Sequence, residues 1–321
     1  MDFDRPPEGV TFTNLDEPLF DGAGANKRDL VSYLDAVADR IIAELRDRPL
    51  SVIRVLRGQA PFMQKNLPVY TPPWVRTVRL WAETSHREVT YALCNDLPTL
   101  LWFANQRAIE FHPALLRTDH RASPLYLVVD LDPPSADAFP MAVAAARLVR
   151  TVLEEVGMSG AVKTSGAKGV HVFIPVAHAT FDELAAAARA LAARAERLDP
   201  SLATTAFIKE DRGGRVFIDY TRVGGATVVS AYSPRARPGV PVSFPVAWDE
   251  LERIAPHAFT IHSVAPLVAA RDPWMEHMPA PQRLADSLVA EGHELPAARV
   301  QAMHEGRRRA RARRAAVGSD E

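Results

Sequence analysis

The chain has 321 residues, of which 47% are hydrophobic, and a formal net charge of −1. This length and hydrophobic share predict a well-buried core, in one large domain or in two closely packed ones. The charge excludes a strong overall field of the kind that attracts nucleic acids, so any site for a polyanion must come from local patches.

The cysteine content and the lengths of the apolar runs indicate the cellular compartment. Cys94 is the only cysteine, which excludes an intrachain disulfide and a cysteine metal cluster. The first nine residues lack the basic-then-apolar pattern of a signal peptide, and no apolar run reaches the roughly 20 residues of a membrane helix. We therefore expect a soluble cytoplasmic protein with no membrane segment.

The first third of the chain opens with a helix expected over 29–46, because Asn26 can cap its start and apolar residues recur on one face. Alternating or β-branched residues then predict strands at 51–57, 75–81 and 89–94. Pro98 opens a helix expected over 99–107, and a short strand is expected at 108–113.

The rest of the chain begins with the clearest strand of the sequence, the apolar run 124–132. The elements expected after it are a helix at 141–156 that stops at Gly157, a short strand ending at Thr164, a turn at 165–169, a strand at 170–175, a helix at 181–198 with a capping box of Thr180 and Glu183, and strands at 215–220 and 227–232. From about residue 281 the chain is expected to be helical and polar.

The expected helices and strands do not alternate regularly, which favours an α+β fold over a doubly wound sheet. We expect one domain over residues 1–290, made of two packed subregions of about 1–120 and 121–290. Residues 291–321 are expected to form a basic helical or disordered tail. Six arginines between 307 and 314 could give this tail a nonspecific, salt-sensitive affinity for DNA, or they could simply be solvated.

Two aspartates end the apolar strand expected at 124–132. Asp130 and Asp132 are separated by one residue, so their side chains share a face and start about 6.6 Å apart. A divalent cation would relieve their repulsion, and oxygen ligands suit Mg²⁺ or Mn²⁺. Both could instead be solvated aspartates before the turn at Pro133 and Pro134, and spacing alone does not separate these interpretations.

A third carboxylate, Asp219, ends the apolar strand expected at 215–220. Polymerase-type sites often take two carboxylates from one strand and a third from another, and two metal ions about 3.5–4 Å apart can then clamp a phosphoryl displacement. Asp219 could instead start a turn. The three aspartates predict a metal site if they lie close together.

A glycine-containing turn lies in the segment KTSGAKGVHVFIP. Gly166 and Gly169 permit a tight turn whose N–H groups can converge on an anion. Ser165 adds a hydroxyl, Lys168 a charge, and His171 lies two residues into the next strand. The spacing is not that of a Walker A loop. A glycine turn beside a buried, hydrogen-bonded histidine is the alternative, but we favour a triphosphate cradle.

Two further positions carry weaker signals. His112 could donate to a phosphate or to a metal-bound water, and a structural role is equally supported. Lys27 and Arg28 lie at the start of the first helix, where the helix dipole disfavours cations. A phosphate partner would remove that conflict and use the free N–H groups. Otherwise these are solvated charges.

Phe62, Met63 and Lys65 lie in a segment expected to be a proline-flanked loop. They could stack on a base and hold a phosphate, or the apolar pair could pack into the core. Arginines in two glycine- or proline-containing segments could also bind phosphates, namely Arg212, Arg215, Arg235 and Arg237.

Taken together, several segments resemble the polymerase domain of bacterial ATP-dependent DNA ligase D, a branch of the archaeo-eukaryotic primase superfamily. In chain order they are TFTNLDEPLF, NKRDLVSYLDAVA, PFMQKN, LPTLLWFANQRAIEFHP, LVVDLDP, VKTSGAKGVHVFIP, RVFIDY and AYSPRARPG. They span roughly residues 11 to 250, and the combination of DLDP, SGAKGVH and FIDY in this order is highly specific.

The resemblance implies a primase-like catalytic core with an RRM-like mixed or antiparallel sheet packed with helices, plus an N-terminal α/β part. It implies a nucleotidyltransferase that adds nucleotides, preferably ribonucleotides, to DNA 3′ ends with Mn²⁺ or Mg²⁺. Such enzymes act with Ku and a ligase in gap filling or nonhomologous end joining. No K-x-D-G ligase motif is present, so we expect a stand-alone, nucleoid-associated polymerase that meets its ligase in trans.

The resemblance also implies roles for individual residues. Asp130, Asp132 and Asp219 would hold the metals, with His112 beside them. The triphosphate would be held by Ser165, Lys168, His171 and Arg235, with Arg212 on a nearby mobile loop. DNA would be contacted by Asn14 and Lys27, in a pocket for a downstream 5′-phosphate, and by Phe62, Met63 and Lys65 on the template side.

Two departures from the family pattern affect DNA binding. Glu17 stands where the family often has a second lysine, which predicts weaker recognition of a 5′-phosphate. Met63 replaces an aromatic residue, which predicts weaker stacking. These departures leave open an alternative, a catalytically weak module that binds or bridges DNA ends. The three aspartates argue against it, because clustered negative charge does not help a pure DNA binder.

Overall fold

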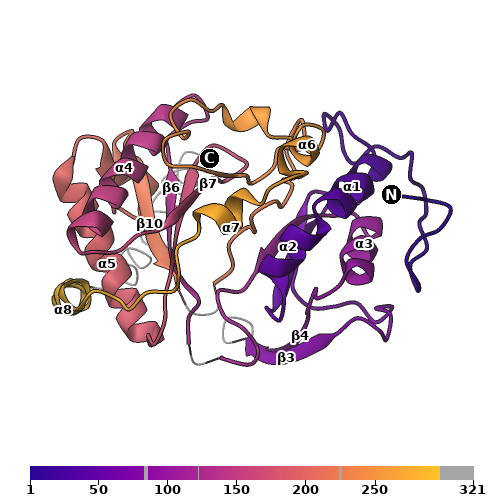
Figure 1. The fold of residues 1–321 in the computed structure, drawn as a ribbon, viewed down its shortest axis with the longest axis horizontal. Helices are drawn as coiled ribbons and strands as arrows, with labels where there is room; N and C mark the ends of the chain where they lie inside the picture. The colour runs from indigo at the N-terminus through magenta and orange to yellow at the C-terminus, as the bar shows by residue number, and fades with distance from the viewer. Residues whose placement is uncertain (83–85, 122, 224–225, 297–321) are drawn as a thin grey trace, which may run out of the picture.

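The computed structural model of the chain describes residues 1–82, 86–121, 123–223 and 226–296. They form two β-sheets with packed helices, in two parts that lie side by side (Figure 1). The predicted α+β fold is confirmed. Every helix among the described residues is too short or too polar to cross a bilayer. The expected tail beyond residue 296 lies outside the described residues.

The first part of the chain builds a five-stranded sheet covered by three helices, on the right of Figure 1. Its elements are α1 (Lys27–Ala36), α2 (Ala38–Leu45), β1 (Leu50–Arg54), β2 (Phe62–Gln64), β3 (Thr77–Ala82), β4 (Arg87–Ala92), α3 (Leu97–Asn105) and β5 (Ala108–Pro113). The strands run in the order β2-β1-β4-β3, and β5 also pairs with β1.

The second part contains a six-stranded sheet in the order β11-β7-β8-β6-β10-β9. Its elements are β6 (Tyr126–Asp132), α4 (Phe139–Glu155), β7 (Ala161–Thr164), β8 (Val170–Pro175), α5 (Phe181–Leu198), β9 (Ala203–Thr204), η1 (Lys209–Arg212), β10 (Val216–Arg222), β11 (Pro245–Val246), η2 (Pro256–Ala258), α6 (Val264–Val268), α7 (Pro273–His277) and α8 (Asp286–Glu294).

The central strands of this second sheet have the connectivity expected from the resemblance. The chain order β6-α4-β7-β8-α5-β10 gives the sheet order β7-β8-β6-β10 with antiparallel neighbours. This β-α-β-β-α-β unit is the arrangement of an RRM-like sheet. The helices α4 and α5 lie on the side away from the first part (Figure 1). Since strand side chains alternate, the other face is free to carry polar residues toward the first part.

Several predicted boundary signals are confirmed. Asn26 caps α1 through a capping box with Asp29, and Thr180 and Glu183 form the expected box at the start of α5. Gly157 follows α4 with φ of 70°, the left-handed conformation that ends many helices. These local hydrogen-bonding patterns were readable from sequence because their partners lie three residues apart.

Three expectations were wrong. The helix expected over 29–46 is divided at Val37, a β-branched residue whose φ of −106° and ψ of 9° leave helical geometry. The strand expected at 227–232 does not form, because Tyr232 has a φ of 64° and its N–H bonds to Ser243 rather than to a ladder. The segment with Phe62 and Met63 is the edge strand β2, not a loop.

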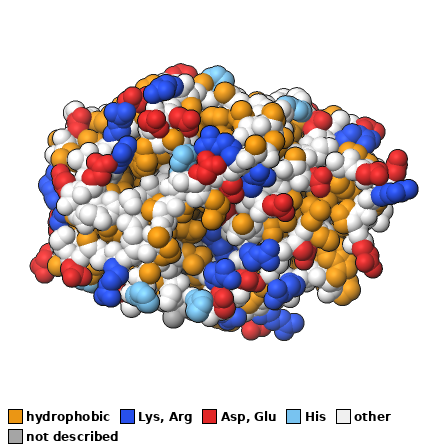
Figure 2. All heavy atoms as spheres, viewed as in Figure 1, with side chains coloured by type: hydrophobic (Ala, Val, Ile, Leu, Met, Phe, Trp, Pro, Cys, Tyr) orange, Lys and Arg blue, Asp and Glu red, His pale blue; other side chains and the backbone are white. Residues whose placement is uncertain are grey.

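The helical structure expected from about residue 281 is confirmed for α8. Helix α8 packs on α5, and Gly292 lies so close that an added Cβ would be 1.9 Å from the carbonyl oxygen of Ala186. On the face drawn in Figure 2, basic and acidic side chains are interspersed, in keeping with the small net charge. A site for an anionic ligand must therefore be sought in local geometry.

Candidate active site

A row of polar residues crosses the polar face of the second sheet. Lys163 on β7 is the partner of His171 on β8, His171 of Asp130 on β6, and Asp130 of Asp219 on β10. Directly paired residues on neighbouring strands point to the same side of a sheet. Asp132 lies two residues beyond Asp130 and shares that face. The sheet thus gathers the three predicted carboxylates and His171.

Arg222 lies between two of these carboxylates. Its Nη2 atom is 3.2 Å from Oδ2 of Asp130 and 3.1 Å from Oδ2 of Asp219. The other oxygen of Asp219 accepts hydrogen bonds from the N–H and hydroxyl of Thr221, at 2.9 Å and 2.5 Å. A guanidinium therefore offsets the charge of the Asp130–Asp219 pair. Our sequence reasoning did not identify Arg222.

A β-bulge explains how Arg222 reaches this face. Asp219 pairs with Asp130, but Arg222 pairs with Val128, so β10 has one more residue than β6 over this stretch. In a regular strand, residues three apart point to opposite faces, and one extra residue restores a common face. The bulge thus places Arg222 beside Asp219.

The two aspartates of β6 have opposite electrostatic environments. Burial would raise the pKa of Asp130, but the neighbouring His171 and Arg222 outweigh it and hold that pKa well below its usual value. Burial and the charge of Asp130 raise the pKa of Asp132, against the opposing charges of Lys168 and Arg212. Acidic groups whose pKa values are driven apart are typical of functional sites.

The chemistry of this cluster fits a divalent cation, although the side chains are not arranged around one. Within the described ranges, no three His, Cys, Asp or Glu side chains are positioned together as a metal site. Arg222 supplies positive charge between Asp130 and Asp219, and Asp132 has no hydrogen bond or ion pair to its side chain among the described residues. Carboxylate oxygens are ligands that Mg²⁺ and Mn²⁺ prefer.

Replacing Arg222 should strengthen cation binding. We expect Arg222→Gln to bind Mn²⁺ about threefold to tenfold more tightly, because each partly exposed ion pair contributes roughly 1 kcal/mol to holding the guanidinium in place. Free Mn²⁺ measured by electron paramagnetic resonance would report the affinity. Arg215→Gln is the matched control, since Arg215 donates to the backbone carbonyls of Arg212, Pro200 and Asp211. Weaker Mn²⁺ binding by Arg222→Gln would contradict this account.

The glycine turn is tied to the end of β6. Oγ of Ser165 accepts hydrogen bonds from the N–H groups of Ala167 at 3.2 Å and Gly169 at 3.0 Å, so these two donors are used within the turn. Nζ of Lys168 donates to the carbonyl of Pro133 at 2.6 Å. An added Cβ on Gly169 would lie 2.2 Å from the carbonyl oxygen of Leu131. The turn therefore packs directly on the strand that carries the aspartates.

Glu110 connects two predicted site residues that are far apart in sequence. Its Oε2 atom is 2.8 Å from Nε2 of His112 and 3.0 Å from Nε of Arg235. Burial would raise the pKa of Glu110, but His112 and Arg235 lower it to about 2. Arg235 also donates to the carbonyl of Ser165, which places it against the glycine turn. Sequence reasoning missed Glu110, whose only signal is that it shares a strand face with His112.

Arg212 lies close enough to the carboxylate cluster to interact with it electrostatically. Its guanidinium stacks over the ring of Phe217 at 3.8 Å and donates to the carbonyls of Ala206 and Phe207. Phe217 is the partner of Asp132 across β10 and β6. Burial lowers the pKa of Arg212, while Asp132 and Asp219 oppose that shift. The structure thus brings Arg212 within electrostatic reach of two predicted metal ligands.

The template-side candidates lie on and after β2, in the first part of the chain. Met63 is 44% exposed and Lys65 is also exposed, whereas Phe62 is half-buried beneath the guanidinium of Arg54 at 5.9 Å. Arg54, at the end of β1, also donates to Gln64 of β2. The exposed residues are available to a ligand, and Phe62 is anchored.

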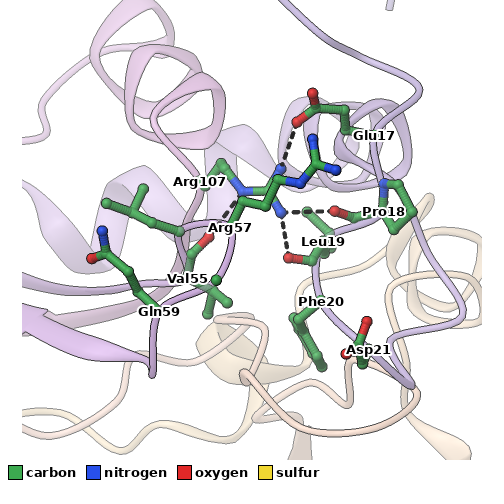
Figure 3. A pocket seen from close by; sticks show the side chains of 11 residues that line it. Glu17, Pro18, Leu19, Phe20, Asp21, Val55, Arg57, Gln59 and Arg107 are labelled. Carbon is green, nitrogen blue, oxygen red and sulfur yellow. Dashed lines mark hydrogen bonds and ion pairs between the residues drawn. The ribbon is translucent and has the colours of Figure 1, made fainter.

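The residues of the predicted 5′-phosphate pocket do not all line one hollow. Lys27 is 3% exposed, and its ammonium donates to Thr13 and to Asn105. Glu17 pairs with Arg107 at 3.3 Å, and Figure 3 shows this contact beside a cavity of about 510 Å³. A second hollow, of about 590 Å³, is lined by Phe12, Asn14, Leu15, Asp16, Glu17, Pro18 and Arg28. Lys27 is not part of that lining.

Comparison with known proteins gives consistent matches. The family described as "LigD, primase-polymerase domain" matches residues 26–274. The "Bifunctional non-homologous end joining protein LigD" of Bacillus subtilis (strain 168) is 33% identical over 261 residues, which are 79% of this chain and 42% of that protein. The "Multifunctional non-homologous end joining DNA repair protein LigD" of Mycobacterium tuberculosis (strain ATCC 25618 / H37Rv) is 30% identical over 294 residues, 87% of this chain and 38% of that protein.

A solved structure agrees with these matches. The "Polymerase Domain from Mycobacterium tuberculosis Ligase D in complex with DNA" superposes with a TM-score of 0.74 at 29% identity. The match covers 88% of this chain and 98% of that one. The chain therefore spans less than half the length of the curated relatives above, but corresponds to nearly the whole of this polymerase domain.

Proposed function

Because the chain belongs to the LigD primase-polymerase domain family, we propose that it is a DNA-dependent nucleotidyltransferase that adds nucleotides to DNA 3′ ends. The observation that carries the proposal is the row of Asp219, Asp130 and His171 across three neighbouring strands, with the glycine turn tied to the end of β6. This row supports the proposal because it puts acidic groups and a candidate phosphate-binding group on one face, as nucleotidyl transfer requires.

In this proposal, Asp130, Asp132 and Asp219 hold two Mn²⁺ or Mg²⁺ ions. When bound, such ions stabilise charge on the attacking 3′ oxygen and on the departing pyrophosphate. Arg222 would move from its position between Asp130 and Asp219 as the ions enter. His112 would lie beside the metals, held by Glu110.

Cationic groups around the glycine turn would hold the triphosphate. Lys168 and Arg235 both contact the turn or the end of β6, and Arg212 lies beside Asp132. Ser165 shapes the turn through its hydroxyl, and His171 would adjoin the triphosphate from its place beside Asp130. Donors fixed in place before the reaction can offset the charge that builds on the phosphates.

DNA would approach the exposed residues of the first part. We propose that Met63 and Lys65, supported by Phe62, contact the template strand. We also propose that Asn14 faces the 5′-phosphate side of a gap, near Lys27. Glu17 adds negative charge there and pairs with the nearby cation Arg107, so 5′-phosphate recognition should be weak. The complex with DNA of the M. tuberculosis domain supports DNA as a partner.

The biological setting and domain limits are part of the same proposal. We propose that residues 1–290 form the catalytic domain, with subregions of about 1–120 and 121–290. It would act in gap filling or nonhomologous end joining in the cytoplasm, at the nucleoid. Ku and a separate DNA ligase would be its partners in trans, as the end-joining names of the relatives suggest.

Primer extension on a gapped duplex tests the proposed activity. We expect template-directed extension with Mn²⁺ or Mg²⁺, loss of extension with a chelator, and faster incorporation of ribonucleotides than of deoxynucleotides. A strong preference for deoxynucleotides would contradict the ribonucleotide assignment. DNA binding without any extension would contradict the polymerase proposal and favour an end-binding module, a role that the placement of Arg222 between two carboxylates would suit.

A further inference from the structure

Lys163 is a buried cation that the proposed reaction does not use. The chain has only five lysines among its 38 basic residues, and the side chain of Lys163 is completely buried on β7. Burying an ammonium is costly unless its donors are satisfied. The contacts of Lys163 therefore indicate what it does.

Three groups surround Nζ of Lys163. It lies 2.9 Å from Nδ1 of His171 and donates to Oγ of Ser243 at 2.5 Å, and the ring of Phe173 is 5.4 Å away. The hydroxyl of Ser243 in turn donates to the carbonyl of Thr164 at 2.8 Å. Lys163 is thus held by its own neighbours and aimed at one nitrogen of the His171 ring.

The other ring nitrogen faces a predicted metal ligand. Nε2 of His171 is 3.3 Å from Oδ1 of Asp130. An ionised carboxylate only accepts hydrogen bonds, so Nε2 must carry the proton in this arrangement. A second proton, on Nδ1, would face the N–H groups of Lys163 at 2.9 Å, so Nδ1 is the acceptor in this contact. Burial lowers the pKa of Lys163, but ammonium and amine both have an N–H to donate.

We propose that Lys163 is a positioning residue that donates to Nδ1 of His171, and so holds the ring with Nε2–H directed at Asp130. Cross-strand pairing supports this, because Lys163, His171 and Asp130 are successive partners on β7, β8 and β6. With its Oδ1 atom fixed by His171, Asp130 keeps Oδ2 directed toward Asp219 and Arg222. The consequence for catalysis rests on the proposed function, but the contact itself does not.

Replacing Lys163 should therefore loosen the position of Asp130 without removing any of the three carboxylates. Hydrogen-bond partners behind metal-binding groups typically contribute tenfold to hundredfold to metal affinity or activity. Since Lys163 acts on Asp130 only through His171, we expect Lys163→Met to raise the Mn²⁺ concentration needed for half-maximal primer extension by about tenfold, the lower end of that range. The kcat at saturating Mn²⁺ should change much less, because the carboxylates remain.

Nitrogen-15 NMR of the histidine rings tests the contact without DNA or nucleotide. In wild-type protein, the His171 signals, assigned with His171→Gln, should show a protonated Nε2 and a hydrogen-bonded, unprotonated Nδ1. In Lys163→Met the Nδ1 signal should move toward that of an unbonded nitrogen. Lys209→Met is the matched control, because it makes the same change at a lysine of η1, outside the row of Lys163, His171 and Asp130. It should keep the His171 spectrum and the Mn²⁺ requirement of the wild type.

Two results would overturn the proposal. A proton on Nδ1 in the wild-type protein would make Lys163 an acceptor, and this result does not require the variant to fold. An unchanged His171 spectrum and Mn²⁺ requirement in folded Lys163→Met would reduce Lys163 to a structural role. Absence of extension by the wild-type enzyme would instead contradict the proposed function, and the NMR result would still decide the contact.

Discussion

Primer extension by an Asp132→Ala variant is expected to fall at least about a thousandfold, the equivalent of roughly 4 kcal/mol of transition-state stabilisation. Asp132 shares a face with Asp130 and Asp219, and its pKa is raised by burial and by Asp130. Its carboxylate has no hydrogen bond or ion pair among the described residues, so a cation is its natural partner. Single-turnover extension of a gapped duplex would measure the effect.

The same substitution should leave the fold intact. Removing one of three repelling carboxylates costs no native hydrogen bond within the described part of the chain, so the melting temperature should stay the same or rise slightly. The control is Asp137→Ala, which removes an exposed aspartate five residues further along. It should extend primers like the wild type. Unchanged extension by folded Asp132→Ala would remove Asp132 from the proposed metal site.

Gly169→Ala is expected to damage both stability and activity. The added Cβ would lie 2.2 Å from the carbonyl oxygen of Leu131, and neither backbone can yield without separating the turn from β6. Overpacking of this kind costs about 3 kcal/mol, which corresponds to a fall in melting temperature of roughly 4–6 °C for a domain of this size. Extension by the remaining folded protein should also drop sharply, because Lys168 would lose its position beside Pro133. Thermal unfolding and primer extension check the two effects.

Gly157→Ala separates a steric effect from the ordinary cost of replacing a glycine. Gly157 has a φ of 70°, but no atom lies within 4 Å of an added Cβ. Its replacement should cost about 1 kcal/mol through backbone strain alone, with normal extension. If Gly169→Ala were no more harmful than Gly157→Ala, the close packing of the turn on β6 would not matter for the site.

The parts of the site that sequence predicted are those fixed by local periodicity. Asp130 and Asp132 had to share a face because strand side chains alternate, and His171 had to lie just beyond the glycine turn. The capping boxes at Asn26 and Thr180 were likewise local patterns. The proximity of DLDP, SGAKGVH and FIDY was predicted only from the family resemblance. Each motif lies on or beside a different strand, and the pairing of those strands cannot be predicted from any one motif alone.

The parts that sequence missed depend on contacts between distant residues. Arg222 reaches the site only through the bulge in β10, and a regular strand would have pointed it away. Glu110 and Arg235 are far apart in the chain and meet beside the glycine turn. Lys163 could be seen as a rare lysine, but its complete burial and its contact with His171 require the register of β7 and β8.

The guanidinium of Arg222, held between Asp130 and Asp219, would also affect how a nucleoside triphosphate approaches the proposed site. A nucleoside triphosphate is a polyanion, and three uncompensated carboxylates would repel it at long range. With Arg222 in place, part of that repulsion is cancelled before any ion has entered. In the proposed reaction, the nucleotide would bring its own divalent ion to these carboxylates, so that arrival of the cation would become an exchange for Arg222 and encounter with substrate would be less sensitive to ionic strength.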